Sequence, residues 1–460
     1  MSGSINQILY NASSGMSAQK ALMQLAGKNV ANADSPSYSR QRMQLFANAA
    51  PGMAVAQGAL EAIRSSTLQR SILGAAQGLG FQLGRQEVLK LAEPAIDDLQ
   101  GSGVSKALGD FFESVSELGG NPTGMAERQQ ILAKARALAQ SIRASASTLE
   151  DARVAAEKEG QLSVASMNEI TSEIARLNKE ISARRNTDDP GPELVDQRDV
   201  LLGQLAGNVD IQTLEQSDGT VSVFLASGPV LVDGDAASTL ELQGGGQDPL
   251  SLSVRRPDGS TLSPMAPPGG RLGGTFEARD KVLASALSKL DDLASGLAGK
   301  MNALHAAGFG LDGSTGIPLF EPPAAVQGAA LNFSLSAAID GHPEKVAAAN
   351  DATLLPGDDS NIAAMLALQD DATAVGGTKS FASAWDGVVE TVTFALHDAS
   401  SQAAVQQGRV EHFEASRASL SGVSIQEEMA QLSQAQRAFE ASTKVVEVAD
   451  QLYEAVLRMV

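Results

Sequence analysis

The chain has 460 residues and carries 54 acidic against 34 basic side chains, a formal net charge of -20. A length above about 250–300 residues exceeds what one hydrophobic core usually supports, so two to four domains are expected. This negative charge excludes nucleic acid as a partner, because a phosphate backbone requires clustered Lys and Arg. Cysteine is absent, which excludes a disulfide framework, a thiolate zinc site and a cysteine nucleophile.

The composition favours long helices. The chain has one Trp and three Tyr, and abundant Ala, Ser, Gln and Leu are typical of an elongated helical protein. No apolar run approaches the roughly 18 residues that span a bilayer, so no membrane insertion is expected. The amino terminus lacks the basic region, apolar core and cleavage site of a secretory signal. The protein is therefore expected to be cytoplasmic or to be exported without a cleaved signal.

The first predicted element is a helix over residues 4–30. Its apolar residues alternate in steps of four and three, with Gln19 as the one polar interruption, and this spacing is typical of a coiled-coil seam. Ser4 and Gln7 fit a capping box at its start. The seam residues are Ile5, Leu9, Ala12, Met16, Met23, Ala26 and Val30.

Residues 29–40 end this helix with a polar, turn-forming stretch. The stretch resembles the signature of the axial proteins of the bacterial flagellum (rod, hook and hook-associated proteins), in which Asn-Ile/Val-Ala-Asn leads to a Pro-Gly-Tyr turn and an Arg. The matching residues are Asn29, Val30, Ala31, Asn32, Pro36, Tyr38 and Arg40. Ser37 stands where the family usually has Gly, so a type I turn is expected in place of type II.

Helical periodicity continues from about residue 60 to 206, apart from a loop near Gly119–Pro122. A further helix is predicted after Pro190 and Pro192, and its residues 193–202 resemble a stretch of the hook-filament junction branch of the axial family. The tetrapeptide that carries this resemblance is Asp196, Gln197, Arg198 and Asp199. Two carboxylates one turn apart could suggest acid-base chemistry, but we favour a charged helix face, because perturbed pKa values need burial or convergent partners.

A small antiparallel β element is predicted over residues 207–275. Val221, Val223 and Leu225 alternate with other side chains, and Asp218–Gly219 and Asp258–Gly259 are turn signals. Helix returns with an apolar seam from Leu283 to Leu304 and leads into a glycine-rich loop over residues 308–316.

The last third of the chain is predicted to be mostly helical. Residues 321–356 leave room for little more than the strand-like Leu331–Leu335, so any outer domain is reduced or missing. A seam from Trp385 to Leu420 predicts the penultimate helix, which Gly422 ends.

The last helix begins after Ser424, which forms a capping box with Glu427. Its sequence resembles the terminal helix of the same axial family. Isolated helices of this length are marginal in water, so both terminal helices need each other or neighbouring copies. The seam residues of the last helix are Ile425, Met429, Leu432, Phe439, Val446 and Leu452.

The sequence contains few patterns that are typical of catalysis, cofactor binding or metal binding. Gly78, Gly80 and Gly84 have the wrong spacing for a dinucleotide fingerprint and more simply predict a helix break, and Gly376–Ser380 lacks the first glycine of a phosphate-binding loop. The four histidines are scattered without ligand spacing. We therefore expect no catalytic residue, no cofactor and no metal site, and the protein is not expected to be an enzyme.

The expected fold class is mainly α with a minor β part, in an elongated multi-domain axial protein whose terminal helices pair in a coiled-coil-like bundle. The expected domains are a terminal helical domain (residues 1–60 and 421–460), a helical rod-like domain (61–206, 276–320 and 357–420), a small antiparallel β element (207–275) and a short irregular or β segment (321–356).

The resemblance implies a structural subunit that joins the flagellar hook to the filament and polymerises through its terminal helices. It also implies a homo-oligomeric ring, contacts with the hook protein and the next hook-associated protein, an export chaperone and an extracellular location on the flagellum. A rod or hook subunit is an alternative, but it predicts a β-rich interior. A secreted coiled-coil effector or enzyme is a further alternative, and it predicts a buried polar constellation that the sequence does not show.

Overall fold

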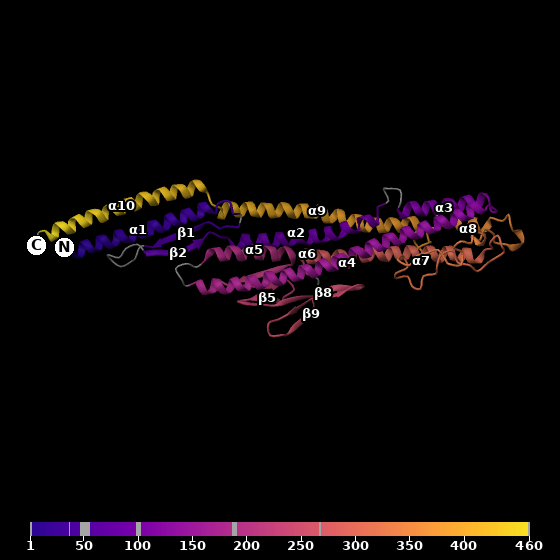
Figure 1. Ribbon diagram of the computed structural model, residues 1–460, viewed down its shortest axis with the longest axis horizontal. Coiled ribbons are helices and arrows are strands. Elements are labelled where there is room, and N and C mark those ends of the chain that lie inside the picture. The colour runs from indigo at the N-terminus through magenta and orange to yellow at the C-terminus, as the bar shows by residue number, and fades with distance from the viewer. Residues whose placement is uncertain are drawn as a thin grey trace.

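The protein is a long, mainly helical molecule with both termini at one end (Figure 1). The computed structural model describes residues 2–35, 37–46, 56–97, 103–185, 191–265 and 268–458. The fold class predicted from the sequence is confirmed, since long helices dominate and the strands form small antiparallel sheets.

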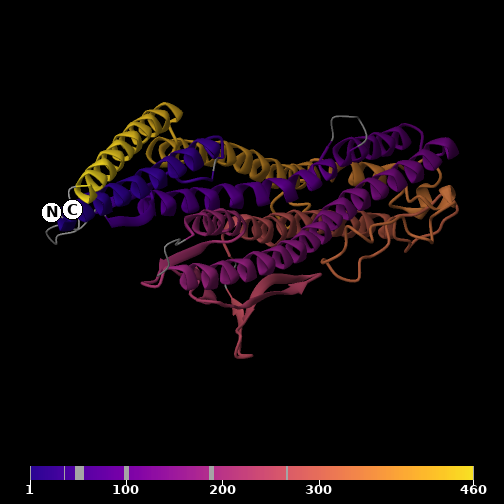
Figure 2. The same cartoon turned by 60° about the vertical axis from the view of Figure 1, so that its left-hand side comes forward.

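The terminal helices α1 (Ser2–Ala31) and α10 (Ile425–Leu457) pair side by side in antiparallel order (Figures 1 and 2). The side chains buried between them are small or aliphatic: Ile5, Ala12, Ala18, Leu25 and Ala26 in α1, and Ala435 and Ala449 in α10. The capping box predicted at Ser4 is wrong, because α1 already begins at Ser2. Ser424 does precede α10, and its hydroxyl accepts the N–H of Glu427 at 3.4 Å.

A β-hairpin follows α1, where the sequence had been read as part of a helical domain. Strands β1 (Gln41–Phe46) and β2 (Ala56–Ala62) pair antiparallel. Residues 1–60 are expected to belong to the terminal helical domain, and no sequence pattern indicated this hairpin within it. Arg40 leads directly into this hairpin, because Ile63 donates its backbone N–H to the Arg40 carbonyl at 2.8 Å.

The remaining helices form what we call the helical body. It consists of α2 (Ser66–Ala92), α3 (Val104–Gly120), α4 (Met125–Arg184), α5 (Pro192–Asn208), α6 (Gly270–Glu277), a π-helical turn (Ala278–Leu283), α7 (Ala284–Ala307), α8 (Ser360–Ala367) and α9 (Phe381–Ser421), with short 3-10 turns at Glu93–Ala95, Pro343–Lys345 and Ala352–Leu354. Helices α4 and α9 each pack on both α2 and α7. Helices α4 and α9 therefore lie at opposite corners of the group that they form with α2 and α7. The predicted loop before α4 is present, since α3 ends at Gly120 and α4 begins at Met125.

Aromatic side chains fill the core at the far end of the helical body. Phe111 contacts both Phe112 and Phe320, and Phe320 stacks on Phe333 with ring centroids 4.7 Å apart. Trp385 is fully buried in the same core. A cluster of aromatic residues thus forms where α3, α9 and the loop after α7 meet.

Helix α2 runs unbroken through the glycines at which a helix break had been predicted, and that prediction is wrong. A Cβ on Gly80 would lie 1.9 Å from the Gly207 carbonyl oxygen, and one on Gly84 would lie 2.1 Å from that of Arg271. These glycines instead let the backbones of α5 and α6 approach α2 closely.

The predicted antiparallel β element is confirmed as two small sheets along one side of the body (Figures 1 and 2). The first sheet has the order β3 (Ile211–Glu215), β4 (Val221–Leu225), β5 (Val230–Asp233), β6 (Ala236–Ala237), and the second has the order β7 (Thr239–Gly245), β8 (Asp248–Arg255), β9 (Thr261–Met265). Their inward side chains, including Val223 and Leu252, pack with Met167 and Ile174 of α4.

Residues 321–356 are irregular. The strand predicted at Leu331–Leu335 is absent, and only an isolated bridge joins Phe320 to Leu335. The apolar side chains of this segment pack in the core at the far end of the helical body and not in a sheet. Across the described ranges, no helix combines the length and apolar character needed to cross a membrane.

Candidate assembly site

A network of polar side chains joins the terminal helix pair to the helical body. We call it the polar joint and define it as Asn29, Tyr38, Arg40, Asp196 and Glu428. The axial signature singled out three of these residues in the sequence, and the Asp196–Asp199 tetrapeptide singled out a fourth. They come from the end of α1, the turn after it, α5 and the first turn of α10.

Asn29 lies at the centre of the polar joint and is buried. Its amide nitrogen donates to the Gln41 carbonyl at 2.9 Å and to Glu428 Oε2 at 3.0 Å. Its amide oxygen accepts the Tyr38 hydroxyl at 2.8 Å and the Gln41 backbone N–H at 3.1 Å. With all these bonds formed, Asn29 fixes the chain after α1 and the start of α10 at once.

Arg40 pairs with both acidic residues of the first turn of α10. Its Nε lies 2.8 Å from Glu428 Oε1, and its Nη1 lies 2.8 Å from Glu427 Oε2. Only 1% of the Glu428 side chain is exposed. A buried carboxylate is stable only when its hydrogen bonds are satisfied, and Arg40 and Asn29 satisfy this one.

Glu428 was missed as a site residue. Acidic residues in a first turn are expected from the helix dipole alone, so its sequence position gave no sign of burial. Only the contact with residues far away in the chain shows its role.

Asp196 anchors the joint to the helical body. It accepts the Ser39 hydroxyl at 2.8 Å and the Ser39 backbone N–H at 3.2 Å, and it pairs with Arg64 at 2.6 Å. The second carboxylate, Asp199, lies 3.9 Å from Arg64. The tetrapeptide was interpreted as a charged helix face. Asp196 and Arg198 are buried, so these two residues do not form such a face, whereas Gln197 is exposed and Asp199 is partly buried.

Arg198 points away from the joint and holds α5 to the β element. It is buried and donates to Asn178 Oδ1 at 3.0 Å and to the Gly219 carbonyl at 2.7 Å. Asn178 in turn bonds to Val221 and Gly234. The tetrapeptide therefore connects the joint, α4 and the first sheet.

The electrostatics of the site follow from burial and pairing. Burial, followed by the charges of Asp196, Glu428 and Glu193, raises the pKa of Tyr38 to about 12, so its phenol stays a neutral donor. Burial raises the pKa of Asp199, which Arg64 and Arg198 oppose. Burial lowers the pKa of Arg198. Because these groups are committed to one another, the arrangement is suited to holding geometry rather than to proton transfer.

One further signature residue lies beside the joint. Asn32 donates to the Lys28 carbonyl at 2.8 Å and caps the end of α1. Pro36 lies outside the described residues, and so does the type I turn expected there. The Tyr38 N–H donates to the Ser35 carbonyl at 3.1 Å.

The predicted seam residues fall into three groups. Ile5, Ala12 and Ala26 are buried between the terminal helices, whereas Ile425, Met429 and Leu452 are half exposed. The others are partly buried: Leu9, Met16, Met23, Val30, Leu432, Phe439 and Val446. Ala18 and Leu25 are buried in place of Gln19 and Met23, because the helical period of 3.6 drifts from a strict seven-residue repeat.

Three exposed apolar residues of the terminal helices were missed in the sequence. They are Ile8, Val445 and Val448, and they lie near the predicted Leu452, which is also exposed. Together with Ile5 and Ala449 they line an apolar groove of about 260 Å³ along the α1–α10 pair. In the described part of the chain, no three His, Asp or Glu side chains are grouped as metal ligands.

A mainly helical body, an antiparallel pair of terminal helices and the axial signature at their joint define the class as flagellar axial proteins. The sequence profile described as the flagellar hook-associated protein FlgK helical domain matches residues 90–320, and that of the C-terminal region of the flagellar basal body rod FlgEFG proteins matches residues 416–459. The chain belongs to the family of flagellar hook-associated protein FlgK.

Individual relatives agree with this membership. The flagellar hook-associated protein 1 of Bacillus subtilis (strain 168) is 26% identical, over 98% of this chain and 97% of that protein. The Escherichia coli (strain K12) protein of the same name is 23% identical, over 99% of this chain and all of that protein. With the Salmonella typhimurium protein the identity is 26%, but the match covers 69% of this chain and spans only 59% of the relative.

A solved structure shows the same fold. The flagellar hook junction protein FlgK from Burkholderia pseudomallei superposes with a TM-score of 0.65 and 17% identity, over 78% of this chain and the whole of that chain.

Proposed function

We propose that this chain is a structural subunit of the bacterial flagellum that forms the junction between hook and filament. Its relatives carry the name hook-associated protein 1, and the solved structure with this fold is that of a hook junction protein. The observation that carries the proposal is a terminal helix pair with half-exposed Ile425, Met429 and Leu452, held on the body by a buried polar joint.

Polymerisation through the terminal helices follows from the energetics of this pair. Each large apolar side chain that becomes buried contributes about 1.5–3 kcal/mol. The groove formed by Ile8, Val448 and Leu452 offers several such side chains to neighbouring copies. Assembly therefore buries apolar side chains that are exposed in the isolated chain. It also couples the ordering of the terminal helices to their binding.

The polar joint supports this role by fixing the angle between the terminal pair and the body. Contacts made by α1 and α10 inside a ring would then orient the body, on whose surface the hook protein and the next hook-associated protein dock. We also propose an export chaperone that would cover the exposed apolar side chains of α10. The subunit would act outside the cell, on the flagellum, and would have no catalytic role.

A rod or hook subunit is the second candidate, because the profile that matches residues 416–459 is named for rod proteins. The long helices of the body favour the junction, since the hook-associated profile covers residues 90–320.

Deletion of the gene tests the proposal. We expect complete hooks without filaments by electron microscopy, with unpolymerised flagellin in the medium. Absent hooks would support the rod or hook alternative, and normal filaments would overturn the flagellar assignment. Complementation with Val448→Glu should fail, whereas Leu354→Glu should restore filaments, because Leu354 is similarly exposed but lies far from the terminal pair.

A further inference from the structure

Strand β3 is the edge strand of the first sheet, because the sheet order is β3-β4-β5-β6. The bonds at its two ends show which of its backbone groups face outward. Ala226 donates its N–H to the Asp210 carbonyl at 3.0 Å, and Gln216 donates to the Thr220 carbonyl at 2.8 Å. Opposed residues of an antiparallel pair alternate between bonded and non-bonded pairs. The even-numbered positions of β3 therefore bond to β4, and the odd-numbered positions 211, 213 and 215 direct their N–H and C=O groups to the outer edge.

This outer edge is covered at its start and open at its end. Gln77 of α2 donates its side-chain amide to the Ile211 carbonyl at 2.8 Å. In the described part of the chain, no group bonds to the outward N–H or C=O of Thr213 and Glu215. Leu214 between them is 55% exposed. A cavity of about 400 Å³ lies beside these three residues, and the start of α2 and α5 form its other walls.

The other edges of the two sheets are protected from further pairing. At β7, Asn168 of α4 donates to the Leu240 carbonyl at 2.9 Å and accepts the Leu240 N–H at 2.7 Å. Strand β9 contains Pro264, which has no N–H, and β6 is only two residues long. Coverage by a helix, proline and short length are common protections of a sheet edge. The last three residues of β3 have none of these three protections.

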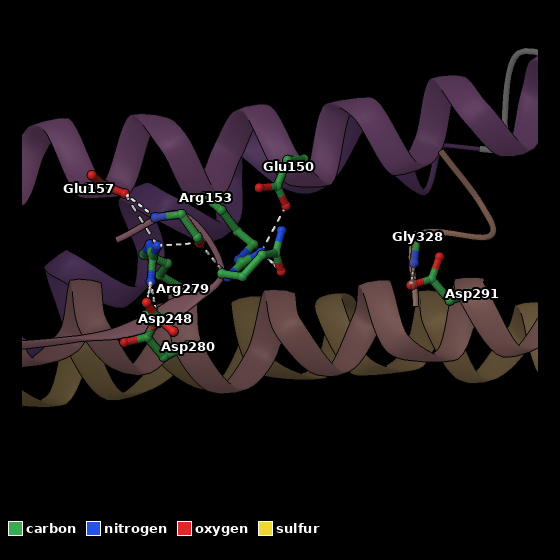
Figure 3. Close-up of polar contacts among 10 residues, drawn as sticks. Glu150, Arg153, Glu157, Asp248, Arg279, Asp280, Asp291 and Gly328 are labelled. Atoms are coloured by element: carbon green, nitrogen blue, oxygen red, sulfur yellow. Dashed lines mark hydrogen bonds and ion pairs between the residues drawn. The ribbon is translucent and has the colours of Figure 1, made fainter. Parts of the chain in front are cut away.

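The two sheets are also fixed on the helical body, so the cavity has firm walls. At the turn between β7 and β8, Arg153 and Arg279 donate to the Gly246 carbonyl at 3.1 Å and 2.8 Å, and Glu157 accepts the Gly246 N–H at 3.0 Å (Figure 3). Buried Arg198 fixes the first sheet through its bond to the Gly219 carbonyl. A preformed site lowers the entropic cost of binding a flexible ligand.

The cavity is rich in arginine, although the net charge of the chain is -20. Its lining includes four arginines but only three acids. Arg64 is already paired with Asp196 at 2.6 Å. Arg70 is exposed, and within the described ranges its side chain bonds only to the Ser66 carbonyl of its own helix, at 3.3 Å. A carboxylate that enters the cavity therefore finds a cation that no acid neutralises.

We propose that the open edge of β3 binds an extended, acidic segment of another protein, which adds to the sheet as a further strand. The backbone of this segment pairs with Thr213 and Glu215, and one of its carboxylates pairs with Arg70. In strand addition of this kind, main-chain bonds supply affinity and adjacent pockets supply specificity. The inference goes beyond the proposed function and does not depend on it.

The open groups themselves select an extended occupant. Thr213 and Glu215 are two residues apart, which is about 7 Å along a strand, and each presents one donor and one acceptor. A helix already uses its own N–H and C=O groups, so it could not bond to them. A second copy is a poorer occupant, because pairing of β3 with β3 would bring two arginine-rich cavities together.

Binding of a synthetic strand tests the proposal. The probe is an acetylated peptide of seven residues, in which Thr alternates with Val and the central residue is Asp. It carries an uncharged fluorophore, and fluorescence anisotropy measures its binding to the full-length protein. We expect saturable binding, which is lost when the central residues of the peptide are N-methylated and their backbone donors removed. Replacement of the central Asp by Lys should weaken binding about threefold to tenfold.

Two variants separate the backbone contribution from the charge. Thr213→Pro removes the outward N–H without removing a bond to β4, and it should weaken binding at least about tenfold. Arg70→Glu should weaken binding of the Asp peptide and strengthen that of the Lys peptide, a reversal that a folding defect could not produce. Lys158→Glu is the matched control, since Lys158 is exposed on α4 and does not line the cavity. It should bind both peptides as the wild type does.

Several outcomes would overturn the strand addition. They are equal binding of the N-methylated peptide, no saturable binding at millimolar peptide, or an affinity that neither Thr213→Pro nor Arg70→Glu changes. Light scattering of the protein alone tests the other occupant, since dimers that Thr213→Pro abolishes would assign the edge to a second copy and overturn the proposal. All of these results leave the proposed function standing, because deletion of the gene tests that function separately.

Discussion

Asn29 and Glu428 are 399 positions apart in the sequence, yet the Asn29 amide donates to the Glu428 carboxylate at 3.0 Å. The same carboxylate accepts from Arg40 at 2.8 Å. One buried acid thus ties both ends of the chain to the turn that leads into the body. If the terminal pair drives polymerisation, this contact is where its orientation is set.

Loss of that acid should loosen α10. Glu428→Ala removes one charged partner from each of Asn29 and Arg40, and we expect a loss of about 2–3 kcal/mol in the local stability of α10, since hydrogen bonds to charged groups contribute about 1.5–3 kcal/mol. Hydrogen exchange of the α10 amides measures it. Glu427→Ala is the matched control, because the exposed pair of Glu427 with Arg40 should contribute less than about 1 kcal/mol. Equal effects of the two variants would contradict the role of Glu428.

Helix α2 offers a test of close backbone packing. Gly80→Ala would place a Cβ 1.9 Å from the Gly207 carbonyl oxygen, and overpacking of this kind costs about 1–3 kcal/mol. Gly74→Ala in the same helix meets nothing within 4 Å and should stabilise by about 0.5–1 kcal/mol. Urea unfolding of both variants measures the difference. A neutral Gly80→Ala would show that α2 and α5 do not pack as described.

Alkaline pH should weaken the polar joint through Tyr38. Its pKa is raised from 10.0 to about 12. The contribution of the neutral phenol to the stability of the folded protein is therefore complete below pH 10, and it is lost as the pH rises through 12. Ultraviolet titration of phenolate absorbance should show one Tyr ionising near pH 12. This late step should disappear in Tyr38→Phe, and its persistence there would assign the step to another tyrosine.

Acidic pH should loosen the loop after α7 through His305. Its Nδ1–H donates to the Ile317 carbonyl at 2.6 Å, and its Nε2 accepts the Ala347 N–H at 3.1 Å, so both nitrogens are used in the neutral form. Burial lowers the pKa of His305 from 6.5, and nearby Arg128 lowers it further, against the bond to Ile317. The contribution of neutral His305 to the stability of the folded protein is therefore present above pH 6.5. It is lost as the pH falls through the lowered pKa that His305 has in the folded state. Urea midpoints of the wild type and His305→Gln should converge on acidification, and a constant gap would contradict this role.

Local features of the fold could be predicted from the sequence. The loop before α4 and the end of α9 follow from apolar periodicity and from turn residues such as Pro122 and Gly422. Alternation and Asp-Gly turns predicted the antiparallel β element, which forms two sheets. The axial signature selected Asn29, Tyr38 and Arg40, and the tetrapeptide of α5 selected Asp196; the fold brings these residues together. These features depend on neighbours in the chain, so a single sequence contains their signal.

Other features were decided only by the tertiary structure. Burial of Glu428 and the use of Gly80 for helix contact rather than a helix break both depend on which elements meet. Periodicity shows that a helix has an apolar side but not which partner covers it. The free energy of a buried charge or of a close backbone contact is set by the atoms opposite, and those atoms lie far away in the sequence.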